Sequence, residues 1–208
     1  MQTIIGFLYS IDKALFVFFN QTISNPVFDV VMPFLTDLNK SSIGWILFVT
    51  LWLLLMWKGG KKGRVIGLLL IPLIYITDQL SSSVIKNIIM RPRPCHEING
   101  VSIFEHIRLL VPCGSGYSFP SSHAANNFAI ATFLSYHYRR WAWACYTFAG
   151  LMAFSRVSVG VHYTSDILGG ALLGVLCGIG IILLRSFIAR KVSLLDFSTH
   201  YQVNRQHP

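Results

Sequence analysis

Long apolar segments dominate the hydrophobic pattern of this chain. Seven of them are separated by short polar stretches: residues 4–19, 25–38, 43–57, 65–85, 124–138, 141–154 and 166–188. A helix needs about 20 mainly apolar residues to cross about 30 Å of hydrocarbon. Lipid offers no partners to backbone N–H and C=O groups, so each crossing segment is expected to be helical. The pattern predicts an all-α fold, a polytopic transmembrane helix bundle that forms one domain over residues 1–208.

Charge separates the first two apolar segments from the other five. The first two contain Asp12, Lys13, Asp29 and Asp37. A charge near the bilayer centre costs about 2.5–3.5 kcal/mol on insertion scales. We therefore predict that residues 1–40 form interfacial helices lying on the membrane, followed by five spans. The alternative for residues 4–19 is a sixth span.

Composition and the distribution of basic residues support this interpretation. The chain is 53% hydrophobic and 12% charged, with a net charge of +9; soluble domains carry about 25% charged residues. With five spans, the links at 58–64 and 139–140 and the polar tail at 193–208 fall on one face. Lys and Arg gather in these segments, which marks that face as cytoplasmic. The positive charge therefore indicates topology, and no basic, aromatic-rich soluble domain suggests nucleic acid as a partner.

A minority of basic residues contradicts the topology rule. These are Lys86, Arg91, Arg93, Arg108 and Arg156, which fall on or near the opposite, outer face. An anion held at that face would explain cations in this position.

Three stretches from separate helix ends are predicted to meet at the outer face. They contain Lys86 with Arg93-Pro94, Pro120-Ser121-Ser122-His123, and Ser155-Arg156 with His162 and Asp166. The stretches resemble the three motifs of the type 2 phosphatidic acid phosphatase (PAP2) family: Lys-x6-Arg-Pro, Pro-Ser-Gly-His and Ser-Arg-x5-His-x3-Asp. The resemblance covers residues 65–188, and the one departure is Ser122 where the family has Gly.

The resemblance implies a role for each residue, and the chemistry of phosphoryl transfer agrees with those roles. His162 is the expected nucleophile, oriented by Asp166 one helical turn away, and His123 is the expected general acid. The expected phosphate-binding residues are Lys86, Arg93, Ser121, Ser122 and Arg156. The first helical turn after Pro120 offers free N–H groups, which attract phosphate. No metal and no cofactor is expected.

Each of these residues also has a plain structural interpretation. Ser121 and Ser122 could be no more than helix-capping residues, and Arg91 could be an anchor for anionic lipid heads. Asp78, inside a span, could tune Lys86 or simply bond a neighbouring helix; we favour the second. Gly170, Gly174 and Gly178 form a stripe typical of close helix packing.

Two cysteines flank the polar loop that follows the first motif. Cys95 and Cys113 are predicted to form a disulfide if the loop is extracytoplasmic, where oxidation is permitted. The alternative is a zinc site built from Cys95, His96, His106 and Cys113, although this spacing matches no tight metal pattern. We favour the disulfide.

The predicted function is that of a bacterial membrane lipid phosphatase. Its active site is expected to face the exterior or periplasm from the inner membrane. The substrate class is a lipid phosphomonoester or diphosphate, of the undecaprenyl diphosphate, phosphatidic acid, phosphatidylglycerol phosphate or lipid A type, with undecaprenyl diphosphate the first choice. The alternatives are a lipid phosphotransferase using the same site and a non-enzymatic lipid transporter or scaffold. A haloperoxidase would share the motifs but needs vanadate and normally a soluble fold. The chain is expected to act as a monomer or a homodimer.

Overall fold

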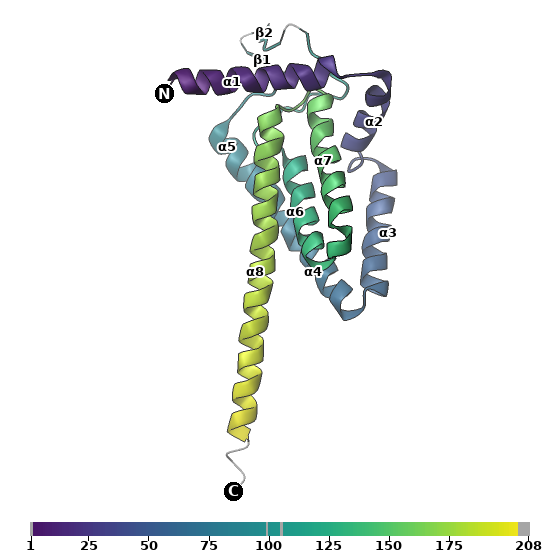
Figure 1. Ribbon diagram of the computed structural model, residues 1–208, viewed down its shortest axis with the longest axis vertical. Helices are drawn as coiled ribbons and strands as arrows, with labels where there is room; N and C mark the ends of the chain where they lie inside the picture. Colours follow the sequence, from purple (N-terminus) through teal and green to yellow (C-terminus); the bar gives the residue numbers. More distant parts are fainter. Residues whose placement is uncertain (1, 99, 105, 204–208) are drawn as a thin grey trace.

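A helical bundle with one helix lying across its end makes up the fold (Figure 1). The computed structural model describes residues 2–98, 100–104 and 106–203. Its helices are α1 (Gln2–Val17), α2 (Pro26–Thr36), α3 (Ser42–Lys58), α4 (Gly60–Gln79), α5 (Lys86–Ile89), α6 (Ser122–His137), α7 (Ala142–Ser158) and α8 (Thr164–Val203). Strands β1 (Glu97–Ile98) and β2 (Val101–Ser102) form one short antiparallel pair. The prediction of an all-α fold is confirmed, apart from this pair.

All five segments predicted as spans are helical. A π-helical turn at Leu80–Ile85 joins α4 to α5, so that Gly60–Ile89 is one continuous helix. This helix and Thr164–Lys191 within α8 are long and apolar enough to cross a membrane, and α3 is a shorter apolar helix. Helix α8 continues beyond the predicted span to Val203. The first part of the predicted polar tail is therefore helical, and residues 204–208 lie outside the described residues.

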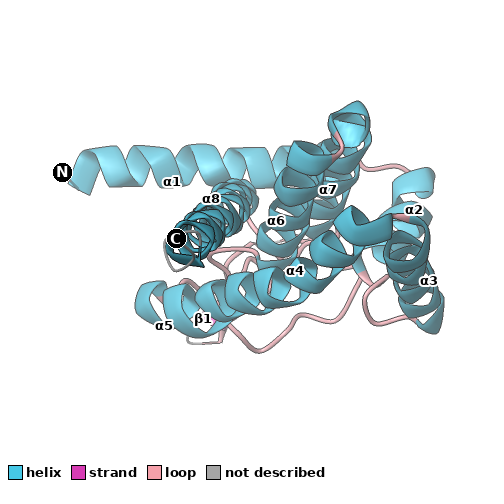
Figure 2. Ribbon diagram, turned by 90° about the horizontal axis from the view of Figure 1, so that it is seen from below, coloured by secondary structure: helices cyan, strands magenta, loops and turns pink. Residues whose placement is uncertain are grey.

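The bundle has two distinct ends. At one end, called here the α1 end, lie α1, the segment between α5 and α6, and the turn between α7 and α8 (Figure 1). The turns α3–α4 and α6–α7 lie at the opposite end, where Lys62 Nζ donates to the carbonyl of His137 at 2.7 Å. Seen from below, α1 runs crosswise to α8 rather than alongside it (Figure 2). The three motif stretches therefore share the α1 end.

Helix α6 packs at the centre of the bundle against α8. A Cβ built at Gly170 or Gly174 would meet the carbonyl oxygen of Ser121 at 2.4 Å or that of Ala125 at 2.2 Å. Only glycine at these positions lets the two backbones approach so closely. The glycine stripe therefore packs within the chain, as predicted, and it fixes the start of α6 against the start of α8.

Large apolar side chains face outward along the other side of α8. Leu168, Leu172, Leu176 and Leu183 are 57–65% exposed. Leucines repeated on one helix face in this way form a continuous apolar surface, which supports contact with lipid.

Candidate active site

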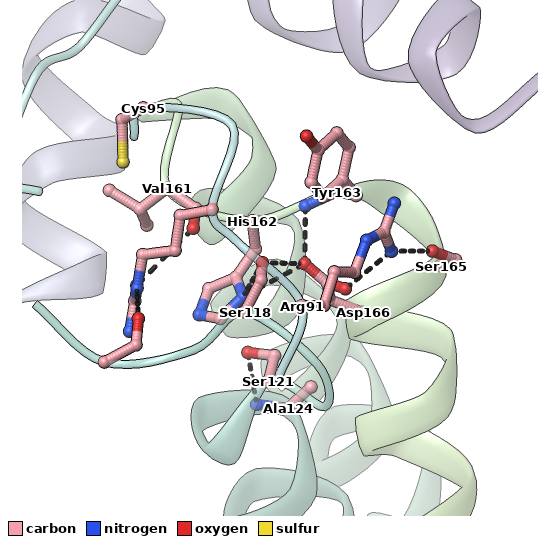
Figure 3. Close-up of polar contacts among 12 residues, drawn as sticks. Arg91, Cys95, Ser118, Ser121, Ala124, Val161, His162, Tyr163, Ser165 and Asp166 are labelled. Carbon is pink, nitrogen blue, oxygen red and sulfur yellow. Dashed lines mark hydrogen bonds and ion pairs between the residues drawn. The ribbon is translucent and has the colours of Figure 1, made fainter. Parts of the chain in front are cut away.

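A buried His–Asp pair lies at the turn that leads into α8. His162 is 1% exposed and Asp166 is fully buried. The Nδ1 atom of His162 lies 3.3 Å from Oδ2 of Asp166 (Figure 3). His162 lies in the bend before α8, which begins at Thr164, and Asp166 lies in the first turn of that helix. The bend, and not a shared helix face as predicted, brings the two side chains together. The predicted contact between the proposed nucleophile and its orienting carboxylate is therefore present.

Gly160 allows this turn to form. Its φ of +87° lies in the left-handed region, and a Cβ there would meet the carbonyl oxygen of Arg108 at 2.6 Å. Both conditions favour glycine over any other residue. The turn can then place His162 directly above α8.

Other donors hold the carboxylate of Asp166 in place. The backbone N–H of Tyr163 donates to Oδ2 at 2.8 Å, and the hydroxyl of Ser118 donates to the same oxygen. The guanidinium of Arg91 donates to Oδ1 at 2.8 Å (Figure 3). With both of its oxygens fixed, Asp166 can accept a hydrogen bond from Nδ1–H of His162. The other ring nitrogen, Nε2, then carries no proton and its lone pair is free.

The surroundings of His162 favour its neutral form. Burial lowers the pKa of this imidazole to about 4, and the cations Arg93 and Arg156 act in the same direction against Asp166. At neutral pH the ring is therefore uncharged. A neutral ring with one nitrogen held by a carboxylate is the form that can attack phosphorus.

Three cations lie within electrostatic reach of the pair: Arg93 and Arg156 act on His162, and Lys86 acts on Asp166. Arg93 is 8% exposed; its Nε donates to the carbonyl of Gly116 at 2.7 Å, and burial lowers the pKa of its guanidinium. Arg156 is 7% exposed and donates from one terminal nitrogen to the hydroxyl of Thr36 at 2.6 Å. Lys86 lies half-buried at the start of α5. Among the described residues, none of the three forms an ion pair.

Two nitrogens of the site are buried without a hydrogen-bond partner in the described part of the chain: Nε of Arg156 and Nε2 of His123. His123 lies in the first turn of α6, within electrostatic reach of Lys86, Arg156 and His162. Buried polar groups are nearly always paired in native proteins. Burial, together with the charge of Arg156, lowers the pKa of the His123 imidazole to about 3 in this structure. A bound anion would accept a hydrogen bond from Nε of Arg156 and would favour a protonated His123 that donates from Nε2.

The two serines of the second motif have different surroundings. Ser121 is fully buried, and its hydroxyl accepts from the backbone N–H of Ala124 at 3.5 Å (Figure 3). The hydroxyl of Ser122 bonds that of Ser81 at 3.0 Å. Ser121 thus has the capping role given above as the alternative, and its contribution to phosphate binding remains a prediction. Asp78 accepts from Asn126 of α6 at 3.1 Å, which is the structural role favoured for it.

A disulfide joins Cys95 to Cys113, with their Cα atoms 6.0 Å apart. It closes the loop that carries β1 and β2, beside Arg93. His96 lies near this bridge and its Nε2 is 2.9 Å from the carbonyl oxygen of Gly114. With both sulfurs bonded to each other, the alternative zinc site loses two of its four ligands. Glu105 of this loop lies outside the described residues.

The sequence did not indicate Ser118 or Asp12 as members of the Asp166 carboxylate network, and it singled out Arg91 only as an outer-face cation for an anion or a lipid head. Ser118 and Arg91 contact Asp166 directly, and Asp12 of α1 binds Arg91 at 2.6 Å. Arg91 lies outside the motif pattern, and Asp12 was interpreted only as a charge that keeps α1 out of the bilayer. Two features of the sequence could have indicated this contact: Asp12 is an isolated acid in an apolar segment, and Arg91 is an additional arginine next to the first motif.

Known proteins share both the sequence and the fold. Residues 67–190 match the PAP2 superfamily. The lipid A 4'-phosphatase of Bacteroides thetaiotaomicron is 30% identical over 174 residues, which are 82% of this chain and 75% of that protein. Undecaprenyl-diphosphatase BcrC of Bacillus subtilis is 27% identical over 154 residues, 74% of this chain and 73% of the relative.

A solved structure agrees with these relatives. The crystal structure of Aquifex aeolicus LpxE matches with a TM-score of 0.67 and 28% identity, covering 83% of this chain and 94% of that one. Because the matched segment contains all three motifs, the resemblance predicted from them is confirmed: the chain belongs to the PAP2 superfamily.

Proposed function

We propose that this protein is a membrane lipid phosphatase that acts through a phosphohistidine at the extracytoplasmic face. One observation carries the proposal. Arg93 and Arg156 act electrostatically on a neutral His162 whose Nδ1 faces Asp166, and Lys86 acts on Asp166. Among the described residues none of the three cations forms an ion pair. Such a site suits a phosphoryl group, whose transfer needs positive charge around the equatorial oxygens and an in-line nucleophile.

The chemistry proceeds in two steps. The negative charge of the bound phosphate favours the protonated form of His123. Nε2 of His162 attacks phosphorus while the bond from phosphorus to the leaving lipid oxygen breaks, and protonated His123 gives its proton to that oxygen. His123 then removes a proton from water, and the resulting hydroxide attacks phosphorus. The P–N bond breaks, inorganic phosphate leaves and His162 returns to its neutral form. The three cations stabilise the negative charge that develops on the phosphoryl oxygens, so this mechanism needs no metal ion for that purpose.

A lipid substrate is supported by an apolar cavity that begins at Asn127, one helical turn from His123. It has a volume of about 560 Å³, lies between α3, α4, α6 and α7, and is lined by Asn127, Ile130 and Leu134 of α6 and by Tyr138 just past its end. Asn127 also donates to the backbone carbonyl of His123 at 2.9 Å. From His123 to Tyr138 the helix rises roughly 22 Å, at about 1.5 Å per residue. We propose that the apolar tail of the substrate lies in this cavity, below its phosphate.

The topology proposed here is that of five spans with the α1 end outside. It is supported by the Lys and Arg residues of the α3–α4 and α6–α7 turns at the opposite end, called here the basic turns, and by the disulfide at the α1 end. Helices α1 and α2 would then lie in the outer interface. The relatives named above make lipid A and undecaprenyl diphosphate the first two substrates to test.

The test is the release of inorganic phosphate by the purified protein in detergent. The panel contains undecaprenyl diphosphate, a lipid A phosphate, phosphatidic acid and phosphatidylglycerol phosphate. We expect release from at least one lipid, undiminished by excess chelator, and none from His162→Ala, which should still bind that lipid. Turnover by His162→Ala would remove the proposed nucleophile, and activity that needs an added divalent ion would contradict the metal-free mechanism. Transfer to a second lipid without free phosphate would identify a phosphotransferase instead.

A further inference from the structure

A buried acid on α1 is linked to the active site through Arg91. Asp12 is 8% exposed. Its Oδ2 accepts from Arg91 at 2.6 Å, and its Oδ1 accepts from the backbone N–H of Ser165 at 2.9 Å. The other terminal nitrogen of Arg91 donates to Ser165 at 2.6 Å and to Asp166 at 2.8 Å (Figure 3). The guanidinium of Arg91 therefore bridges two carboxylates, that of Asp12 on α1 and that of Asp166 on α8.

Several contacts hold α1 in position for this bridge. Phe16 is fully buried, with its ring centroid 5.7 Å from that of Tyr163. Asn20, in the π-helical turn after α1, donates to the carbonyls of Arg108 and Ser158, at 2.9 Å in each case. Arg91 lies over the Tyr163 ring at 3.8 Å. The first helix therefore packs as part of the active-site wall, which fixes where Asp12 can place the guanidinium.

Electrostatics gives this bridge a chemical consequence. Arg91 alone would leave a full positive charge against Asp166 and weaken the support that Asp166 gives to His162. The second carboxylate compensates that charge, since an opposite charge at hydrogen-bond distance offsets much of its field. Both carboxylates also fix the plane of the guanidinium through directed hydrogen bonds.

We propose that Asp12 and Arg91 are positioning residues that set the basicity of His162 through Asp166. This inference rests on the proposed function, because it takes His162 as the nucleophile. The other groups around the pair carry their own charges or protons: Lys86, Arg93, His123, Arg156 and Tyr163. They stay unchanged in the variants below, so differences between variants report on the Asp12–Arg91 bridge.

Two charge-removing variants should shift the pKa of His162 in opposite directions. Asp12→Asn leaves Arg91 uncompensated, so the pKa of His162 should fall. Arg91→Gln leaves both carboxylates without their cation, so the pKa of His162 should rise. We expect shifts of about half a unit or more each way, measured by NMR titration of histidine-labelled protein in detergent. Turnover should fall several-fold in Asp12→Asn, because a less basic His162 is a weaker nucleophile, and in Arg91→Gln, because Asp166 loses the donor that holds its Oδ1. KM should stay close to wild type in both variants, because neither residue is proposed to touch the substrate.

Asp29→Asn is the matched control. Asp29 lies on α2 and accepts from Arg108 at 2.5 and 2.6 Å, so it also ties the N-terminal region to the loop. It makes no contact with Asp166 among the described residues, and its variant should keep the wild-type pKa of His162. Asp12→Glu, which retains the charge, should recover part of the lost turnover.

The outcomes separate the possible explanations. If Asp12→Asn does not fold, Arg91→Gln is compared with Arg91→Lys, which keeps the charge. Loss of packing would expose His162 and raise its pKa in both variants, whereas loss of the charge raises it only in Arg91→Gln. An equal rise in both would overturn the inference. Shifts in the same direction, or none in either variant, would overturn the inference, while an inactive His162→Ala would leave the proposed function intact. Turnover by His162→Ala would instead defeat the proposed function itself.

Discussion

At the residue scale, the site depends on keeping one imidazole neutral inside a ring of cations. Burial and the positive charges of Arg93 and Arg156 disfavour protonation of His162, and Asp166 opposes them only in part. The same carboxylate accepts from Ser118 and Tyr163, so its orientation does not depend on His162 alone. A ring held in this way is ready to attack without first losing a proton.

The protonation of His162 can be tested directly. We expect its pKa in the resting protein to lie near 4, below the ordinary histidine value of about 6.5. The neutral form then dominates from about pH 5 upward, with the proton on Nδ1. Nitrogen NMR of histidine-labelled protein reports both the pKa and the tautomer, with His162→Ala to assign the signal. A pKa at or above the ordinary value would show that the ring is not desolvated as described.

Residue-scale prediction from the sequence was uneven. Spacing indicated the pairing of His162 with Asp166, although the two residues do not share a helix face, because His162 lies in the bend before α8. It could not find Asp12, since the contact from α1 to Arg91 depends on where a helix 79 positions away in sequence comes to lie. Nor could it separate capping from phosphate binding at Ser121, because both roles use the same helix start.

At the element scale, the contact between α6 and α8 positions the second and third motifs relative to each other. The backbone N–H of Ser121 donates to the carbonyl of Asp166 at 3.0 Å. The glycine stripe below that bond sets how closely the two helices approach. Apolar periodicity predicted both helices, and the glycine spacing predicted close packing. The continuous helix from Gly60 to Ile89 was predicted only over residues 65–85, because its first turn contains Lys and Gly residues and its last turn begins at Lys86 and Asn87.

A pair of glycine variants tests this contact. Gly174→Ala puts a Cβ 2.2 Å from the carbonyl oxygen of Ala125, so the helices must separate. We expect a loss of about 1–3 kcal/mol in stability, as in other overpacked cores, together with reduced turnover. Gly180→Ala is the control, because nothing lies within 4 Å of its Cβ. Thermal unfolding in detergent measures both variants, and equal behaviour of the two would argue against a packing role for the stripe.

At the scale of the whole molecule, the two ends of the bundle have different chemistry. The α1 end carries the disulfide and the motif residues, while the basic turns lie at the opposite end. The order of the helices and the basic turns could be predicted from the sequence. The crosswise position of α1 agrees with the interfacial helix predicted for this segment (Figure 1). Its packing over the active site could not be predicted, because hydropathy indicates whether a helix crosses the bilayer but not what it packs against.

The orientation in the membrane can be checked by labelling single cysteines in intact cells. In a background with Cys145 and Cys177 changed to Ser, Ser102→Cys on β2 should react with a membrane-impermeant maleimide. Lys61→Cys, at the α3–α4 turn, should react only after the cells are opened. Both positions are expected to be exposed to water, so reactivity reports the side of the membrane. The reverse pattern would place the active site in the cytoplasm and contradict the proposed topology.

The most direct test of the central claim is to trap the phosphorylated enzyme. His123→Ala, given an aryl phosphate whose leaving group needs no acid, should form the intermediate but hydrolyse it slowly. Labelled phosphate should then accumulate on the protein, resist base, be lost in acid, and map to His162 by mass spectrometry. Absence of label from His162 while phosphate is still released, or label on another residue, would contradict the account.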